Sequence, residues 1–287
     1  MINFKNLKKP YLIAEIGINH NGDLQIAKKL IDAAFSCSWD CAKFQKRNPD
    51  ISVPEHQKNQ PKDTPWGQMT YLEYKYRMEF GEKEYDQIDK YCKHKPIDWT
   101  ASVWDLDSLE FIKKYNPPFI KIPSAHLTNH KLLKVTAQTG IPVVASTGMS
   151  TLKEIDEAVA ILKKHSSQFV LMHCNSSYPA KLHELNLKVI PQFAKRYKCV
   201  MGYSGHEFGL ATTTIAMTLG AQVIERHITL DHTMWGTDQT ASIEIQGMDK
   251  FYKQIVDATL CMGDGKKRVY ETELAMKKKL RGDSFGK

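Results

Sequence analysis

The chain of 287 residues and 32.8 kDa has an ordinary globular composition, with 42% hydrophobic and 25% charged residues. This composition excludes collagen, a coiled coil and a largely disordered chain. Its longest apolar runs are far shorter than the roughly 20 residues that span a bilayer, and its N-terminus lacks the apolar core of a signal peptide. We therefore expect a cytoplasmic protein without a membrane partner, in which the scattered cysteines stay reduced.

The net charge of +8 fits a nucleic acid, a membrane surface or an anionic small molecule as the partner. The basic residues lie mostly in segments with helical amphipathicity, and neither interleaved aromatic residues nor a nucleic-acid-binding motif accompanies them. We therefore expect no nucleic-acid partner, and an anionic metabolite stays open.

Short apolar segments rich in β-branched residues alternate along the chain with segments whose apolar residues recur at helical spacing. The predicted strands are residues 11–17, 40–45, 98–104, 119–124, 142–148, 169–174, 199–204 and 222–228. The clearest predicted helices are residues 24–35, 82–93, 107–115, 151–164 and 209–220. Eight such strand–helix units predict an α/β protein with a closed (β/α)8 TIM barrel, as a single domain over residues 1–287. A doubly wound sheet is the alternative.

A long insertion, roughly residues 46–81, follows the second predicted strand and is rich in Pro, Gln, Tyr and Met. We expect it to be irregular. In such barrels a long loop after a strand lies at the active-site face, so the insertion is a candidate lid.

Polar residues gather at the carboxyl ends of the predicted strands, which converge on one mouth of the barrel. They are Glu15, Lys43, Gln45, Ser102, Lys121, Ser124, Ser146, Thr147, His173, Ser176, Ser204, His206, Glu225 and His227. Each costs desolvation energy unless it is paired or binds a ligand. The set therefore predicts a binding site, although a single member can instead form an internal salt bridge, as Lys43 could with Glu15.

Two lysines and several hydroxyl groups in this set predict an anion site. Lys43 and Lys121, with hydroxyl groups among the serines, suit a phosphate that also bears a carboxylate. Neither a GxxxxGK[ST] nor a GxGxxG motif occurs, so nothing supports ATP or NAD as the ligand.

Two imidazoles end the seventh and eighth predicted strands, which are neighbours in a closed barrel. His206 and His227 could therefore reach one divalent ion and leave coordination positions open for water and substrate. Asp238, in the following polar loop, could ligate the ion or bind hydroxyl groups, although a loop carboxylate is usually only solvated. Hydrogen-bonded structural roles are the alternative for the two histidines.

The same segments carry a family resemblance. The motifs are EIGINHNG (15–22), AKFQ (42–45), FIKIPSAH (119–126), ASTGM (145–149), HCNSSYP (173–179), GYSGH (202–206) and ERHIT (225–229). In order and spacing they resemble the sialic acid synthase family. The resemblance implies a (β/α)8 barrel, active as a homodimer, that condenses phosphoenolpyruvate with an open-chain N-acetylhexosamine aldehyde. It also implies a divalent metal, Mn²⁺ or Mg²⁺, and release of inorganic phosphate.

The resemblance assigns roles to individual residues. His206 and His227 match the metal ligands. The positions that match phosphoenolpyruvate contacts are Lys43, Ser102, Lys121, Ser124, Ser146, Ser176 and Ser204. The positions that match sugar contacts are Glu15, Gln45, Tyr178 and Asp238. We expect Glu15, Lys43, Lys121 and His126 to be the catalytic residues.

Two departures from the family pattern bear on the substrate. His126 stands where members commonly have a glutamate that assists proton transfer, a role that imidazole can also fill. The antifreeze-like C-terminal domain of typical members, which reaches into the partner's active site, is absent from this sequence. Either the insertion at 46–81 covers the pocket instead, or the aldehyde needs no N-acyl contact. Because both departures affect one site, we favour the second possibility, an aldehyde that needs no N-acyl contact.

The predicted activity is thus condensation of phosphoenolpyruvate with an aldose such as N-acetylmannosamine to give a 3-deoxy-2-keto sugar acid. One alternative is an octulosonate or other keto sugar acid synthase that uses a different aldose. A phosphorylated aldose would require an additional basic site, which the sequence does not locate. The other alternative is a non-catalytic barrel that binds sugar phosphates.

Overall fold

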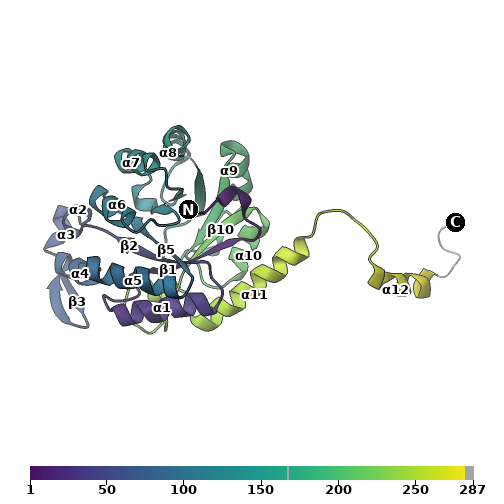
Figure 1. The fold of residues 1–287 in the computed structure, drawn as a ribbon, viewed down its shortest axis with the longest axis horizontal. Coiled ribbons are helices and arrows are strands. Elements are labelled where there is room, and N and C mark those ends of the chain that lie inside the picture. The colour runs from purple at the N-terminus through teal and green to yellow at the C-terminus, as the bar shows by residue number, and fades with distance from the viewer. Residues whose placement is uncertain (167, 282–287) are drawn as a thin grey trace.

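The computed structural model describes residues 1–166 and 168–281, and its centre is a closed barrel of parallel strands (Figure 1). The strand order around the barrel is β1-β10-β9-β8-β7-β6-β5-β2. Their bounds are β1 (Tyr11–Gly17), β2 (Cys41–Lys46), β5 (Asp98–Val103), β6 (Ile120–Ile122), β7 (Val143–Ser146), β8 (Phe169–Cys174), β9 (Val200–Gly205) and β10 (Ala221–His227). The predicted (β/α)8 barrel is confirmed, and the doubly wound sheet is excluded.

Helices surround the barrel and connect successive strands (Figure 1). They are α1 (Leu24–Ser36), α5 (Glu82–His94), α6 (Leu106–Lys113), α7 (His130–Gln138), α8 (Leu152–His165), α9 (Val189–Tyr197), α10 (Ala211–Thr218) and α11 (Ile245–Met262). Local sequence sets where several begin. Asp23 caps α1, and Thr151 with Glu154 forms a capping box at α8. Short 3₁₀ turns occur at Phe4–Asn6, Ser124–His126, Leu182–Glu184 and Gln239–Ala241.

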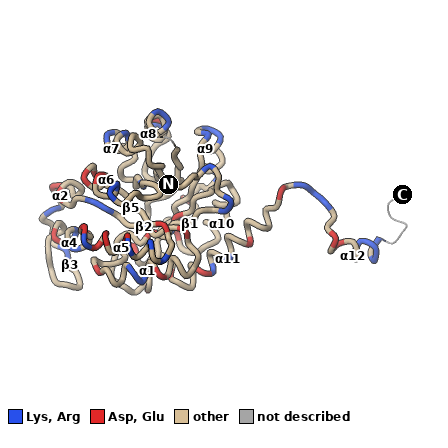
Figure 2. Tube along the Cα trace, in the orientation of Figure 1, with Lys and Arg blue, Asp and Glu red and all other residues tan. Residues whose placement is uncertain are grey.

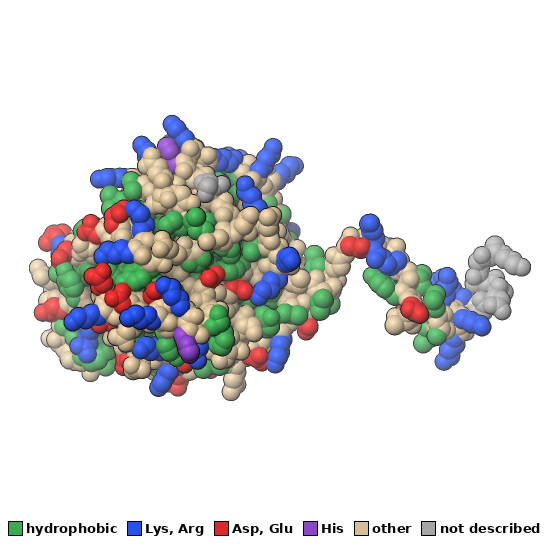
Figure 3. All heavy atoms as spheres, in the orientation of Figure 1, with side chains coloured by type: hydrophobic (Ala, Val, Ile, Leu, Met, Phe, Trp, Pro, Cys, Tyr) green, Lys and Arg blue, Asp and Glu red, His purple; other side chains and the backbone are tan. Residues whose placement is uncertain are grey.

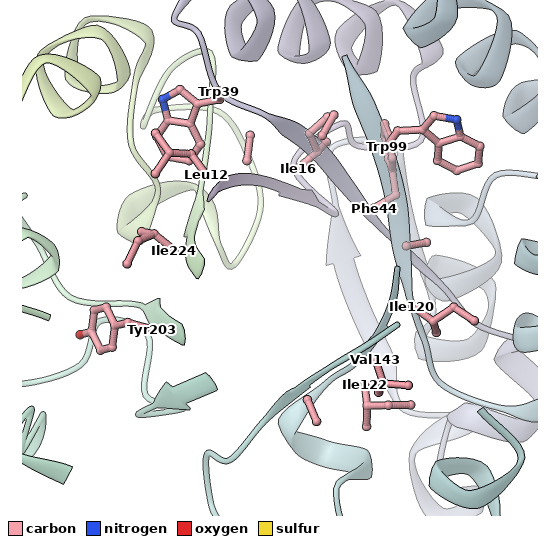
Figure 4. Close-up of a cluster of buried hydrophobic side chains, with 14 of the residues drawn as sticks. Leu12, Ile16, Trp39, Phe44, Trp99, Ile120, Ile122, Val143, Tyr203 and Ile224 are labelled. Atoms are coloured by element: carbon pink, nitrogen blue, oxygen red, sulfur yellow. The ribbon is translucent and has the colours of Figure 1, made fainter. Parts of the chain in front are cut away.

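Side chains along each strand alternate between two apolar clusters. One cluster lies between the strands and the helices and includes Leu12, Phe44 and Ile224 (Figure 4). The other fills the barrel interior toward the amino ends of the strands, where Tyr11 and Phe119 pack with Phe4 of the first 3₁₀ turn.

The interior-facing positions continue from this apolar layer toward the opposite mouth. Side chains two residues apart on a strand point to the same side. The residues two positions after Ile13, Cys41 and Val223 therefore also point into the barrel, and they are Glu15, Lys43 and Glu225. These three charged residues therefore lie toward the carboxyl end of the barrel, where TIM-barrel enzymes have their active sites.

The expectation that residues 46–81 are irregular is wrong. This insertion contains two short helices, α2 (Pro49–Ser52) and α3 (Glu55–Lys58), a hairpin of β3 (Pro61–Thr64) and β4 (Gly67–Thr70), and helix α4 (Tyr71–Met78). Gly67 has φ +104° at the turn of the hairpin, and Thr70 with Glu73 forms a capping box for α4. Such local signals set its structure without long apolar periodicity, and its function as a lid stays a prediction.

The C-terminal segment extends away from the barrel, as Figures 1 and 3 show. Its helix α12 (Glu271–Arg281) is exposed throughout. Residues 282–287, the end of the predicted single domain, lie outside the described residues. Among the helices that the structure does describe, none is both long and apolar enough to cross a membrane.

Candidate active site

A cavity of about 200 Å³ opens at the carboxyl end of the barrel. This volume lies below the 300–1,000 Å³ that is usual for ligand pockets, so the cavity suits small metabolites. Its lining includes most of the predicted site residues: Glu15, Lys43, Gln45, Ser102, Lys121, Ser124, Ser146, Ser176, Tyr178, Ser204, His206 and His227. Parallel pairing brings them together, because Glu15 lies opposite Lys43 on one side and His227 on the other.

A buried cluster of four charges forms the floor of the cavity. Lys43 Nζ lies 2.5 Å from Glu15 Oε2 and 3.5 Å from Glu225 Oε2. Lys121 Nζ donates to Glu225 Oε1 at 3.1 Å. Both lysines are thus paired internally, and the salt bridge between Lys43 and Glu15 that the sequence offered as an alternative is present. The cluster holds two positive and two negative groups in fixed positions inside the barrel.

Glu225 connects both lysines. The sequence placed it at a strand end but assigned it no role of its own. Besides its ion pairs it accepts a hydrogen bond from Ser204 Oγ at 3.0 Å. The sequence held a signal for it: Glu225 lies two residues before His227 on one strand, so both side chains point into the barrel.

The charge cluster shifts the pKa values of its members. Burial alone would raise the pKa of Glu225, but Lys121 and Lys43 outweigh it and hold that pKa at about 2. Burial opposes the charge on Lys43 as well, yet Glu15 and Glu225 raise its pKa. Burial prevails at Lys121 and lowers its pKa despite Glu225. Glu225 is therefore an anion at neutral pH, with Lys43 as its cationic partner.

Hydroxyl groups line the wall between β6 and β8. The Gly148 amide donates to Ser124 Oγ at 3.1 Å. A Cβ atom on Gly148 would lie 2.2 Å from Ser176 Oγ and 2.8 Å from Ser124 Oγ, so only glycine lets these side chains converge there. Ser146 Oγ is buried and has no hydrogen-bond partner among the described residues. A buried polar atom in this state is suited to a ligand oxygen.

The two histidines lie side by side, with ring centroids 5.5 Å apart. His206 Nδ1 lies 2.6 Å from the Asn175 carbonyl oxygen, and its Nε2 lies 3.0 Å from the Tyr178 hydroxyl. If Nδ1 donates to the carbonyl group, Nε2 carries the lone pair and accepts from Tyr178. Burial, together with His227, lowers the pKa of His206 to about 4, so this ring is neutral at pH 7.

This arrangement fits a divalent metal in part. A backbone carbonyl that accepts from Nδ1–H orients a ligating histidine, and the neutral ring is the form that binds metal. His227 Nδ1 is buried without a hydrogen-bond partner in the described structure, and Asp238 Oδ2 lies 3.9 Å from it. No group of three or more His, Cys, Asp or Glu side chains in the described part of the chain is arranged as a complete ligand set. The two imidazoles would therefore hold an ion whose other ligands come from water and substrate.

Two residues to which the resemblance assigns a role, His126 and Asp238, do not line the cavity. His126 packs edge-on against Trp104, with ring centroids 5.2 Å apart, and lines a neighbouring cavity with Asp105 and Asn129. Asp238 is in the loop after β10, with its Oδ2 atom 3.9 Å from His227 Nδ1. One further imidazole at a strand end, His173, turns outward, where its Nε2 lies 2.7 Å from the Leu185 carbonyl oxygen.

Comparison with known proteins agrees with this geometry. A family model described as the NeuB family matches residues 30–267. The chain belongs to the NeuB family. Human N-acetylneuraminate-9-phosphate synthase is 36% identical over 273 residues, which cover 94% of this chain and 76% of that protein. N,N'-diacetyllegionaminic acid synthase from Campylobacter jejuni is 35% identical over 272 residues, with 93% and 81% covered.

A solved structure shares the whole architecture of this NeuB-family protein. It is the N-acetylneuraminic acid synthetase from Leptospira borgpetersenii in complex with citrate, with a TM-score of 0.85 and 30% sequence identity. The match covers 98% of this chain and 97% of that chain. The protein is thus a sialic acid synthase-like enzyme.

Proposed function

We propose that this enzyme condenses phosphoenolpyruvate with an open-chain N-acylated aldose, N-acetylmannosamine or a relative, and releases inorganic phosphate. The product is a nonulosonic acid. The observation that carries the proposal is the pairing of two features in one cavity: Lys43 and Lys121 at the floor, and two adjacent imidazoles at the wall. The lysines match an anionic substrate, and the imidazoles match the carbonyl end of the other substrate.

The residues of the floor hold phosphoenolpyruvate in this proposal. Lys43 and Lys121 bind its carboxylate and phosphate, with Ser102, Ser124, Ser146, Ser176 and Ser204 as additional donors around them. Their ion pairs with Glu15 and Glu225 fix both ammonium groups before the substrate arrives, which lowers the cost of organising the site.

The reaction forms one carbon–carbon bond. The alkene carbon of phosphoenolpyruvate attacks the aldehyde carbon, and the new alkoxide takes up a proton. Water adds to the cationic C2 and loses one proton to a base. The resulting C2 hydroxyl group passes its proton to the phosphate as the C2=O bond forms and the C2–O bond to phosphate breaks. Glu15, 2.5 Å from Lys43 Nζ, is placed to accept the proton that the water loses. His206 and His227 would hold a divalent ion, Mn²⁺ or Mg²⁺, which when bound supplies Lewis-acid polarisation of the aldehyde.

Two of the residues proposed to contact the sugar, Gln45 and Tyr178, line the cavity. Gln45 lies in the cavity and donates to Glu15 Oε1 at 3.1 Å, and Tyr178 stacks on His206 with ring centroids 4.1 Å apart. The preference for an aldehyde without an N-acyl group rested on two departures at one site. Because His126 lies outside the cavity lining, that departure no longer argues for such an aldehyde.

The test is release of phosphate and formation of a keto sugar acid, detected by mass spectrometry, with phosphoenolpyruvate and a panel of aldoses. We expect turnover with an N-acylated mannosamine and a kcat/KM more than about a hundredfold above that for mannose, which is nearly 3 kcal/mol of discrimination. Phosphoenolpyruvate binding without turnover of any aldose would support the non-catalytic barrel instead. Turnover of non-acylated aldoses alone would support the octulosonate-type alternative.

A further inference from the structure

A buried ion pair joins the end of β10 to the turn after β9, and it plays no part in the proposed condensation. Arg226 Nη1 donates to Glu207 Oε1 at 3.2 Å. Figure 2 shows many of the charged positions on the helices around the barrel, whereas these two residues are 1% and 0% exposed. The cost of removing two charges from water can exceed their mutual attraction, so a buried ion pair is weak evidence for stability alone.

Each member of the pair is the neighbour in sequence of one of the two imidazoles. Glu207 follows His206, and Arg226 precedes His227. Neighbouring side chains on a strand point to opposite sides, so Arg226 lies outside the barrel wall while His227 lines the cavity. The ion pair thus connects, from behind, the two chain segments that carry the imidazoles.

The regular pairing of the strands stops short of one imidazole. β9 is in register with β10 only up to Gly205 and Arg226, and its pairing with β8 ends one residue earlier. His206 lies beyond these paired residues, whereas His227 is still paired with Glu15 of β1. The main chain at His206 therefore depends more on other contacts than the main chain at His227 does.

Arg226 supplies such contacts where the strand pairing ends. Its Nη2 donates to the main-chain oxygen of Glu207 at 2.5 Å, and its Nη1 donates to the main-chain oxygen of Gly209 at 3.0 Å and to Thr213 Oγ1 at 2.8 Å. The Glu207 carboxylate also accepts from the Tyr203 hydroxyl at 2.9 Å. A guanidinium presents its donors in one rigid plane, so these contacts fix the turn after β9 relative to β10.

Metal binding depends on the distance between the two rings. An ion bound by both must lie about 2 Å from one nitrogen of each ring, and the ring centroids are 5.5 Å apart. The Asn175 carbonyl oxygen and the Ala180 amide tie His206 to the loop after β8. Beyond the last paired residues, the ion pair is the contact that ties this segment to β10 and hence to His227.

We propose that Arg226 and Glu207 are positioning residues for the divalent metal. By joining the two strand ends from behind, they set the distance between the imidazoles and so the affinity for the ion. The inference rests on the metal site of the proposed function. It also explains why two charges are buried at a place where apolar packing could stabilise the fold equally well.

The test measures Mn²⁺ binding to the full chain without substrates, from the electron paramagnetic resonance signal of the free ion. Arg226→Met and Glu207→Gln should each weaken Mn²⁺ binding by about 10- to 100-fold, the scale for groups that orient metal ligands. The affinity for phosphoenolpyruvate, measured by calorimetry with a chelator present, should stay unchanged. Its proposed contact Ser204 lies within the paired part of β9, so the loss of the ion pair should not move it.

A double variant separates positioning from stability. Arg226→Met alone leaves Glu207 buried without its partner and should lower the thermal stability. Arg226→Met combined with Glu207→Gln removes both charges, so stability should recover while Mn²⁺ binding stays weak. The control is Arg196→Met on α9, which removes a guanidinium paired with Asp156 at 2.6 Å on the surface and should leave Mn²⁺ binding unchanged.

Three outcomes would overturn the inference. Unchanged Mn²⁺ affinity in the double variant would do so and leave the metal site standing. So would an Mn²⁺ affinity that recovers together with the stability, because that pattern indicates a structural role. Absence of Mn²⁺ binding in the unmodified enzyme would refute the metal site and the inference with it, and phosphate release by that enzyme in chelator would leave the proposed condensation standing.

Discussion

Replacing Lys121 by Met should weaken phosphoenolpyruvate binding strongly. The ammonium group is 3% exposed and lies 3.1 Å from Glu225 Oε1, so it acts in a desolvated setting. Truncating one side of such a pair costs about 2–5 kcal/mol, which is about 30- to 5,000-fold in Kd. The effect has two sources: a lost contact to the anion, and repulsion of the anion by Glu225, which Lys121 no longer neutralises.

The same substitution should destabilise the free protein. Breaking a buried ion pair from one side typically costs about 3–5 kcal/mol. Lys43, 3.5 Å from Glu225 Oε2, still offsets part of the negative charge, so we expect the lower end of that range. Because Lys121 is the strongest of the groups that lower the pKa of Glu225, this pKa should rise in the variant.

Isothermal titration of phosphoenolpyruvate into both proteins measures the affinity, and thermal unfolding measures the stability. The matched control is Lys114→Met, which removes a lysine at the same 3.1 Å from a carboxylate, Glu82, but on the surface with 56% exposure. Surface pairs contribute about 0–1 kcal/mol, so this control should change little. Unchanged affinity in Lys121→Met, or an equal loss in both variants, would refute the role of Lys121.

Further outcomes follow from other parts of the site. Removal of metal with a chelator should abolish phosphate release, and added Mn²⁺ should restore it. In the variants His206→Ala and His227→Ala, Mn²⁺ should not restore it. Full activity of either variant after exhaustive chelation would contradict the metal assignment. Gly148→Ala would place a Cβ atom 2.2 Å from Ser176 Oγ, so we expect about 1–3 kcal/mol of strain. Steady-state kinetics should then show a higher KM for phosphoenolpyruvate. An unaltered KM would show that the serines can move.

The barrel and most of its site could be predicted because they depend on two simple spacings of apolar residues, one typical of strands and one typical of helices. Alternation along a parallel strand places every second side chain inside the barrel, and all strands end at the same mouth. A polar residue late in an apolar strand, such as Lys43 or Ser204, therefore marks the cavity without knowledge of any long-range contact. The same reasoning placed Glu225 at the mouth of the barrel. It could not predict that Glu225 pairs with both lysines, because those contacts join strands that meet only in the closed barrel.

The packing of the insertion could not be predicted, because no periodicity governs it. Lys62 and Lys75 come from a hairpin and a short helix whose packing depends on contacts with Trp235, far along the chain. Whether a lysine in such a segment is solvated or partly buried depends on that packing. His126 shows the converse: its place directly after a site strand suggested the cavity, but the 3₁₀ turn at Ser124–His126 carries its ring behind Trp104.

The lysines at the strand ends could be explained either by internal ion pairs or by substrate binding. In the structure, the ion pairs are what allows the lysines to bind a substrate. A lysine buried alone would lose its proton or unfold the barrel, so each ammonium group needs a carboxylate to stay charged inside the protein. Glu15 and Glu225 provide these carboxylates. Both lysines also line the cavity, so they can contact a ligand while they remain paired. Because the four charges balance, the free cavity carries no net charge that would draw in counter-ions. An arriving anion then meets cations that are already desolvated and fixed, which is how a small cavity can select a doubly anionic metabolite from water.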